Sequence, residues 1–242
     1  MRANFLPILP RLILAGLMCL GTLAGPFPAR ADETNIAPGI NAPYADPNVD
    51  NWKKAFETEG REVYAKRQAI VAALKLSPGM NVADIGAGTG LFTLLFAPAV
   101  RPDGKIYAVD IAPNFIAAIQ RTAKQQGINN VIGIVNPPDA LPIPPQSLDL
   151  AFVCDTYHHF EYPQSMLAEI RSALKPDGQL VVIDYERIPG LSSAWVMGHV
   201  RADKAIVIRE IEMAGFRLVQ DLPLMSENYF LRFEQIGWPT MH

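Results

Sequence analysis

The chain has 242 residues, of which 50% are hydrophobic and 19% charged, with a formal net charge of −3. This length accommodates one domain of ordinary size and a short extra segment. The composition indicates a globular protein. The acidic balance excludes a basic surface for nucleic acid, so a small molecule is the expected partner. The sequence does not determine the oligomeric state.

A targeting signal is predicted at the N-terminus. Arg2 and Arg11 precede an apolar run from Leu12 to Gly25, which is followed by Ala29-Arg30-Ala31. A basic region, an apolar core of about 14 residues and an A-x-A site are typical of a secretory signal peptide. Residues 1–31 are therefore expected to be cleaved and the rest exported, to the periplasm. The run is short for a transmembrane segment, so no span is expected after cleavage.

Removal of that segment changes the charge and the cysteine content. Subtracting Arg2, Arg11 and Arg30 from 21 basic residues leaves 18 against 24 acidic ones. Cys154 is the cysteine that remains, so no internal disulfide is expected. Inside an apolar strand, such a thiol favours a packing role. Residues 32–51, rich in Pro, Asn and Ala, are expected to form an extended linker before a domain over 52–242.

A glycine-rich turn follows the first predicted strand. The stretch from Val82 to Gly90 reads V-A-D-I-G-A-G-T-G, and the apolar segment Leu91 to Phe96 comes after it. This pattern predicts a buried strand that turns sharply into a helix. The three glycines allow the backbone to approach a ligand closely, with the first N–H groups of the helix directed at it. Asp84 places a carboxylate at the end of the strand.

A second apolar strand, Lys105 to Ile111, contains Asp110 about 20 residues beyond the glycines. In a doubly wound sheet an acid at this place binds ribose hydroxyls. The glycine spacing here is D-x-G-x-G-x-G, whereas nicotinamide and flavin enzymes use G-x-G-x-x-G, which argues against NAD. Together, these stretches resemble motif I and the acidic residue of class I S-adenosylmethionine-dependent methyltransferases.

The resemblance implies an α/β fold with a Rossmann-like, doubly wound sheet of seven strands, mostly parallel with an antiparallel C-terminal strand. It implies S-adenosylmethionine as cofactor, and an Asp139 carboxylate that accepts a hydrogen bond from the adenine amine. The quinone-biosynthesis methyltransferases share this sequence style in the first half of the chain. The residues expected to contact the cofactor are Asp84, Gly86, Ala87, Gly88, Gly90, Asp110, Ile111, Asp139, Ala140 and Asp155.

The remaining elements continue the alternation of strands and helices. Helices are expected at 52–76, 113–126, 161–174 and 202–214, and strands at 131–135, 148–154, 179–183, 216–222 and 228–234. The stretch 187–201 is expected to form a cap. In the family, a helix like the first lies over the cofactor, which would bring Glu62, Tyr64 or Arg67 near the site, although surface and packing roles are the simpler interpretation for these three.

Catalytic candidates lie where the fourth and fifth predicted strands end, because ligands bind at that end of an α/β sheet. Methyl transfer depends mainly on alignment, and a base is needed only if the acceptor must lose a proton. Asp155, His158, Asp184 and Tyr185 are the predicted catalytic residues, with Tyr157, His159 and His199 nearby in the expected fold. The histidines show no tight ligand spacing, so no metal site is expected.

The predicted function is methyl transfer from S-adenosylmethionine to a small-molecule or lipid-like acceptor. Leu191, Trp195, Val196 and Met197 in the cap are candidates to line an apolar acceptor pocket, or to belong to the core. The alternative is an exported, noncatalytic protein that binds an adenosyl ligand, since S-adenosylmethionine is made and held in the cytosol. Titration with S-adenosylmethionine and S-adenosylhomocysteine tests for the donor site.

Overall fold

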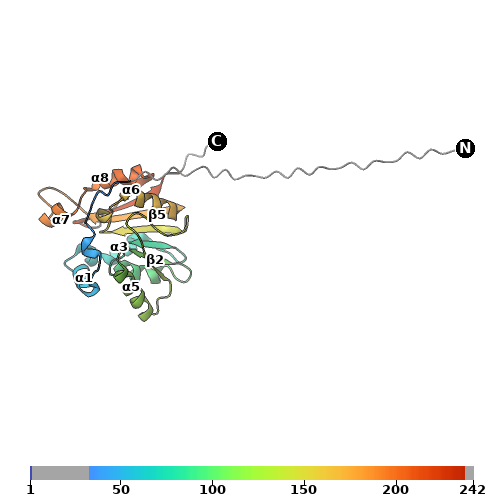
Figure 1. The fold of residues 1–242 in the computed structure, drawn as a ribbon, viewed down its shortest axis with the longest axis horizontal. Coiled ribbons are helices and arrows are strands. Elements are labelled where there is room, and N and C mark those ends of the chain that lie inside the picture. Colours follow the sequence, from blue (N-terminus) through green and yellow to red (C-terminus); the bar gives the residue numbers. More distant parts are fainter. Residues whose placement is uncertain (2–32, 238–242) are drawn as a thin grey trace. The chain divides into compact units, whose positions relative to one another are not determined.

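The computed structural model describes Met1 and residues 33–237. Within this range, seven strands form one sheet in the order β3-β2-β1-β4-β5-β7-β6 (Figure 1). The pairs of β1 to β5 are parallel, whereas β7 is antiparallel to both of its neighbours. The strands are β1 Val82–Ile85, β2 Ile106–Asp110, β3 Val131–Val135, β4 Leu148–Cys154, β5 Leu174–Tyr185, β6 Phe216–Asp221 and β7 Asn228–Gln235. This architecture confirms the predicted fold class.

Helices cover both faces of the sheet (Figure 1). One face packs against α6 and α8 in a core that includes Leu167 and Ile211, and the other packs against α3 and α4 through Ile70 and Phe96. Burial of these apolar side chains on both faces is the main stabilising contribution. The helices are α1 Val49–Phe56, α2 Glu62–Ala65, α3 Arg67–Leu74, α4 Leu91–Ala99, α5 Pro113–Gln125, α6 Pro163–Ala173, α7 Ala194–His199 and α8 Lys204–Met213, with 3-10 turns η1 Ala42–Tyr44 and η2 Tyr157–His159.

The structure corrects two predicted elements. The single helix expected over 52–76 is three helices, because the chain turns between α1 and α2, where Gly60 lies and helix propensity is low. The sequence predicts that the fifth strand begins at Gln179. It begins at Leu174, which pairs with Leu148 before an irregularity shifts the register of β4 and β5.

The segment before α1 packs against the domain. The Glu33 carboxylate accepts hydrogen bonds from the backbone N–H groups of Gln164 and Ser165 at the start of α6, where the unpaired N–H groups of a helix favour an anion. Asn35 Nδ2 donates to Glu161. In this segment, expected as part of a linker, Glu33 contacts α6, Asn41 contacts His159 of η2, and Asp46 contacts Asn114 of α5.

The predicted signal peptide, residues 1–31, falls almost wholly outside the described residues, so its cleavage stays a prediction. Among the helices that the structure describes, none has the length and apolar character needed to cross a bilayer.

We expect Phe230→Ala to lower the free energy of unfolding by about 3–5 kcal/mol, because Phe230 on β7 is fully buried in the core beneath α3 and α4. Val219→Ala on β6 is the control, since Val219 is 40% exposed, and it should cost about 1 kcal/mol or less. Urea unfolding followed by circular dichroism measures both. Equal losses would contradict the assignment of Phe230 to the core.

Candidate functional site

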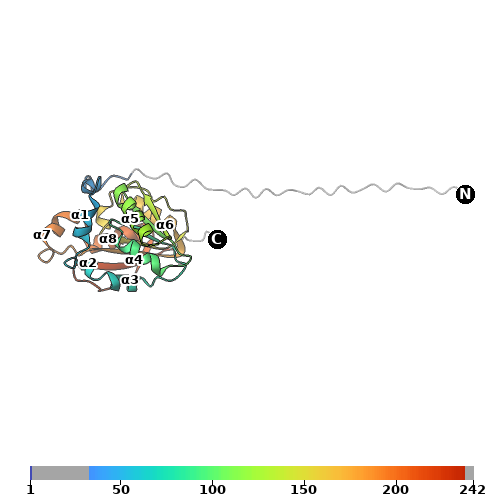
Figure 2. The same ribbon diagram turned by 90° about the horizontal axis from the view of Figure 1, so that it is seen from below.

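A cavity of about 590 Å³ opens at the carboxyl ends of β1, β2, β4 and β5. Its volume lies within the range of about 300–1,000 Å³ that is usual for small-molecule sites. The glycine turn after β1 forms one part of its wall, and residues of α1, η2 and α7 form others. Figure 2 shows α1 and α7 at the same end of the domain.

The backbone of the glycine turn lies so close to neighbouring side chains that a residue with a Cβ atom would not fit at Gly86 or Gly90. The backbone N–H groups of Gly86 and Ala87 both donate to the carbonyl of Val109 on β2. A Cβ atom on Gly86 would lie 2.2 Å from the Thr156 side chain, and one on Gly90 would lie 2.6 Å from Ile119. Both glycines have positive φ, at 74° and 84°. The local sequence thus folds this way because only glycine meets both requirements.

Asp110 fixes the turn from the end of β2. Its carboxylate accepts hydrogen bonds from Gly88 N and Ala112 N, both at 2.8 Å. Burial raises the pKa of Asp110, whereas these two backbone bonds favour the ionised form. Each carboxylate oxygen has a second lone pair, and Asp110 lines the cavity, so it is able to accept hydroxyl donors there.

Asp84 is a second buried acid beside the turn. Its side chain accepts a hydrogen bond of 2.6 Å from Thr93 Oγ1 on α4. Burial raises the pKa of Asp84 to about 6, opposed by the bonds from Thr93. Asp84 is 3% exposed and lines the cavity, so a cationic ligand group nearby would favour the ionised form of its carboxylate.

Asp155 is held by partners from distant parts of the chain. Arg61, in the turn before α2, forms an ion pair with its Oδ2, and Asn228 Nδ2 on β7 donates to its Oδ1 at 2.6 Å. Burial of the Arg61 guanidinium opposes its charge, but Asp155, Tyr185 and Cys154 together raise the pKa of Arg61, with Asp155 the largest of the three. Asp155 also has a φ of +47°. Because both carboxylate oxygens of Asp155 are already bonded, Asp155 is suited to hold Arg61 in place at the cavity.

His158 and Asp184 form a buried pair between η2 and the end of β5. His158 Nδ1 lies 2.8 Å from Asp184 Oδ1, and the backbone N–H of His158 donates to Asp184 Oδ2 at 3.0 Å. Burial opposes the imidazolium, but the charge and the hydrogen bond of Asp184, together with the charge of Asp155, raise the pKa of His158. His158 Nε2 is buried and has no hydrogen-bond partner among the described residues. This atom lies on the ring edge opposite the carboxylate.

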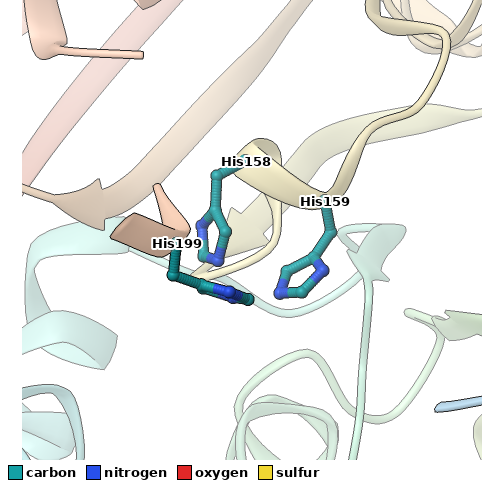
Figure 3. Close-up of side chains that lie close together, drawn as sticks. All are labelled: His158, His159 and His199. Carbon is teal, nitrogen blue, oxygen red and sulfur yellow. The ribbon is translucent and has the colours of Figure 1, made fainter. Parts of the chain in front are cut away.

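The structure brings three histidines together at this end of the cavity (Figure 3). One ring nitrogen from each of His158, His159 and His199 lies within 4.8 Å of the others. His158 and His159 come from η2, and His199 comes from α7. Burial lowers the pKa of His159 to about 3, with further lowering by the charges of the other two histidines. The sequence shows no ligand spacing because the third histidine belongs to a distant segment.

An aromatic wall over the glycine turn is a feature that sequence reasoning missed. Tyr44 stacks on Trp52 with ring centroids 4.8 Å apart, and Trp52 lies 5.0 Å from Phe56. Thr89 Oγ1 donates to Glu57 at 2.9 Å, which ties the end of α1 to the turn. The aromatic spacing at 44, 52 and 56 was the available signal, but it resembles ordinary amphipathic packing.

Of the remaining residues predicted for the site, some line the cavity and others do not. Ala87, Ile111, Tyr185 and Trp195 line the cavity. Burial raises the pKa of Tyr185, so its phenol stays neutral near neutral pH. Asn136 and Pro138 line the cavity from the loop after β3, whereas Asp139 and Ala140 are not among its described lining residues, and their role toward adenine stays a prediction. Six further candidates are also not among the described lining residues, so their contact with the cavity stays a prediction: Glu62, Tyr64, Arg67, Leu191, Val196 and Met197.

Arg61 and Glu62, which are adjacent where α2 begins, contact different parts of the domain. Glu62 accepts hydrogen bonds from the backbone N–H groups of Ser226 and Glu227, in the turn before β7. Its neighbour Arg61 instead enters the cavity wall. The break between α1 and α2 sets these directions, and the sequence alone predicted a continuous helix.

Comparison with known proteins gives a family match over residues 76–226, to the model described as "Methyltransferase domain". Among curated proteins, the ubiquinone/menaquinone biosynthesis C-methyltransferase UbiE of Burkholderia mallei is 29% identical over 123 residues. That match covers 49% of this chain and 48% of the relative, and the Burkholderia thailandensis protein of the same name gives the same values. The chain thus spans about half the length of the curated relatives it matches.

Solved structures share the fold. A SAM-dependent methyltransferase from Aquifex aeolicus aligns with a TM-score of 0.69 at 21% identity, covering 78% of this chain and 98% of that chain. The [4+2]-cyclase SpnF aligns with a TM-score of 0.63 at 17% identity, covering 72% of this chain and 82% of that chain. At these identities the likeness concerns the fold alone.

We predict that Asp84→Asn removes a pH-dependent contribution to the free energy of unfolding. The raised pKa in the folded state means that Asp84 contributes most below its unfolded value near 4, and that this contribution is lost as the pH rises through about 6. The stability of the unsubstituted protein relative to the variant should therefore fall by about 1–2 kcal/mol between pH 5 and 7.5. Urea unfolding at several pH values measures the difference, and a constant difference would contradict the buried-acid assignment.

Proposed function

The chain belongs to the methyltransferase domain family, and from this membership and the cavity we propose that it transfers a methyl group from S-adenosylmethionine to a small-molecule acceptor. It carries a class I S-adenosylmethionine-dependent methyltransferase domain. The proposal rests on one observation: the glycine turn, Asp110 and His158 line the same cavity, and Asp184 contacts His158 Nδ1 at 2.8 Å.

The donor would lie against the glycine turn. Asp110 supports this placement, because its carboxylate is held by Gly88 and Ala112 and keeps lone pairs for the ribose hydroxyls. The buried acid Asp84 suits the positive charge of the donor. The aromatic wall of Tyr44, Trp52 and Phe56 offers apolar surface for the adenosyl group.

The acceptor would enter on the side of η2 and α7. Phe160, Met166 and Trp195 line the cavity there and provide an apolar surface, which suits an apolar or aromatic molecule. The curated relatives are named for ubiquinone and menaquinone biosynthesis, which supports an acceptor of the phenol or hydroquinone type. We therefore propose an apolar acceptor that loses a proton on methylation.

The proposed chemistry is a single displacement. The acceptor atom attacks the methyl carbon, the carbon–sulfur bond breaks, and its electron pair stays on sulfur in S-adenosylhomocysteine. The proton of the acceptor passes to Nε2 of neutral His158, and Asp184 stabilises the imidazolium through Nδ1–H. Arg61 and Asp155 are positioning residues for the cavity wall, and alignment of the reactants supplies much of the rate.

We expect Asp110→Ala to weaken S-adenosylmethionine binding by about 1–3 kcal/mol, or about 5- to 150-fold, because ribose hydroxyls and two backbone N–H groups lose their acceptor. Isothermal titration calorimetry with S-adenosylmethionine and S-adenosylhomocysteine measures this loss. Asp103→Ala is the control, because Asp103 is exposed in a turn outside the cavity. Unchanged affinity in the folded Asp110 variant would show that the ribose assignment is wrong.

We expect His158→Ala to lower kcat by about 10²- to 10⁴-fold and to change the affinity for S-adenosylmethionine less than threefold, about 0.7 kcal/mol, because the base acts on the acceptor rather than on the donor. Asp184→Asn should lower kcat less. The assay follows transfer of a radiolabelled methyl group to a panel of phenols, catechols and hydroquinones, and His242→Ala serves as the control. A weaker affinity for S-adenosylmethionine with an unchanged kcat would contradict the role of His158 as a base.

The same measurements address a noncatalytic role. Donor binding together with methyl transfer to a panel member supports the enzyme. Donor binding without transfer to any acceptor class would support a noncatalytic adenosyl-binding protein, and absence of donor binding by the folded chain would overturn the proposed function.

A further inference from the structure

Three histidine side chains at one end of the cavity have the arrangement of a metal site, and no part of the proposed methyl transfer needs all three. His158 and His159 lie on η2, and His199 reaches them from α7 (Figure 3). One nitrogen of each lies within 4.8 Å of the other two. We propose that His158, His159 and His199 bind one borderline divalent transition-metal ion of the Zn²⁺ class.

The tautomer of His158 favours a metal ligand. Asp184 is an acceptor at 2.8 Å from Nδ1, so in the neutral ring the proton resides on Nδ1 and the lone pair on Nε2. Nε2 is buried without a hydrogen-bond partner among the described residues, and the side chain as a whole is 4% exposed. A carboxylate behind a ligand histidine is the arrangement that orients the ring and strengthens its metal bond.

The tautomer of His159 is fixed in the same sense by Asn41. Asn41 Nδ2 donates to the carbonyl of His159 and to Glu161 Oε1, which fixes the orientation of the amide. Its oxygen Oδ1 then faces His159 Nδ1 at 3.1 Å, and this oxygen can only accept a hydrogen bond, so Nδ1 carries the proton and donates. The lone pair of His159 is therefore also on Nε2. Two adjacent histidines thus each have a partner at Nδ1 and a lone pair at the other ring nitrogen.

His199 supplies the third nitrogen from an element that is able to adjust. In a tetrahedral site with metal–nitrogen distances of about 2.0–2.1 Å, ligand nitrogens lie about 3.4 Å apart. The three rings therefore have to approach by about 1–1.5 Å to meet this geometry. α7 has six residues, of which Val196 is the buried one, and Trp195 stacks on His199 at 4.6 Å. An inward shift of this short helix would close the site.

The donor set selects the ion. Three neutral imidazoles suit Zn²⁺, Co²⁺ or Ni²⁺, whereas Mg²⁺ and Ca²⁺ prefer oxygen ligands. Three histidines leave a coordination position open, and all three line the cavity, so that position faces the space where a small molecule would enter. A bound ion takes the lone pair of His158, so metal binding and the proposed proton transfer by His158 exclude each other in one molecule.

The test is titration of the tag-free, chelator-treated full chain with Co²⁺ and Zn²⁺, without donor or acceptor. We expect one equivalent of Co²⁺ to give visible absorption bands typical of a four-coordinate ion, Zn²⁺ to displace it, and Mg²⁺ to leave it bound. Absence of these bands in the folded chain would overturn the proposal. This readout is independent of S-adenosylmethionine, so its failure is distinguishable from failure of the proposed function.

Variants assign the ligands. His199→Ala should weaken Zn²⁺ binding at least tenfold and His158→Ala likewise, whereas His242→Ala, which removes the remaining histidine of the chain, should leave it unchanged. Asp184→Asn should weaken it about 10- to 100-fold and keep the stoichiometry, as expected for a residue that orients a ligand. Circular dichroism checks the fold of each variant. Equal binding by folded His199→Ala, or loss of binding in His242→Ala, would overturn the assignment.

Discussion

The close passage of the glycine turn between β2 and the segment after β4 is the constraint on which the site depends. Gly86 has no room for a Cβ atom beside Thr156, and Gly90 has none beside Ile119. Because the turn lies this close, Gly88 reaches the Asp110 carboxylate, and the first residues of α4 follow directly. Backbone atoms of the glycine turn thus form this part of the cavity wall, and the side chains proposed to act on a ligand lie around it.

Buried charges are the second organising feature, and each has a partner that limits its cost. Asp155 pairs with Arg61, and Asp184 pairs with His158. Unpaired, such groups would cost several kcal/mol each in a desolvated site. These pairs join segments that are far apart in the sequence: the turn before α2, the end of β4, η2 and the end of β5. The interactions that position the functional groups therefore also hold the rim of the cavity together.

The cavity has two chemically different parts that adjoin each other. The glycine turn and Asp110 offer hydrogen-bonding groups beneath the aromatic wall of Tyr44, Trp52 and Phe56, as the proposed donor site requires. Next to this wall, where the centroid of the Tyr44 ring lies 5.2 Å from that of His159, the cavity is lined by three histidines and by the apolar side chains near α7. This second part is where the proposed acceptor and the proposed metal ion would both bind, so occupancy by one affects the chemistry available to the other.

The strand–turn–helix with its glycines, and Asp110 at the end of the next strand, are predicted by the sequence alone, because they depend on local periodicity and on backbone conformations that glycine permits. The mostly parallel sheet with an antiparallel C-terminal strand is what the family resemblance of these motifs implies, and the structure confirms it. The break between α1 and α2, the Arg61–Asp155 pair and the meeting of His199 with η2 are visible only in the tertiary structure. Such contacts join segments distant along the chain, so no spacing in the sequence records them. They form only when the packed sheet brings its strand ends and the covering helices to one edge.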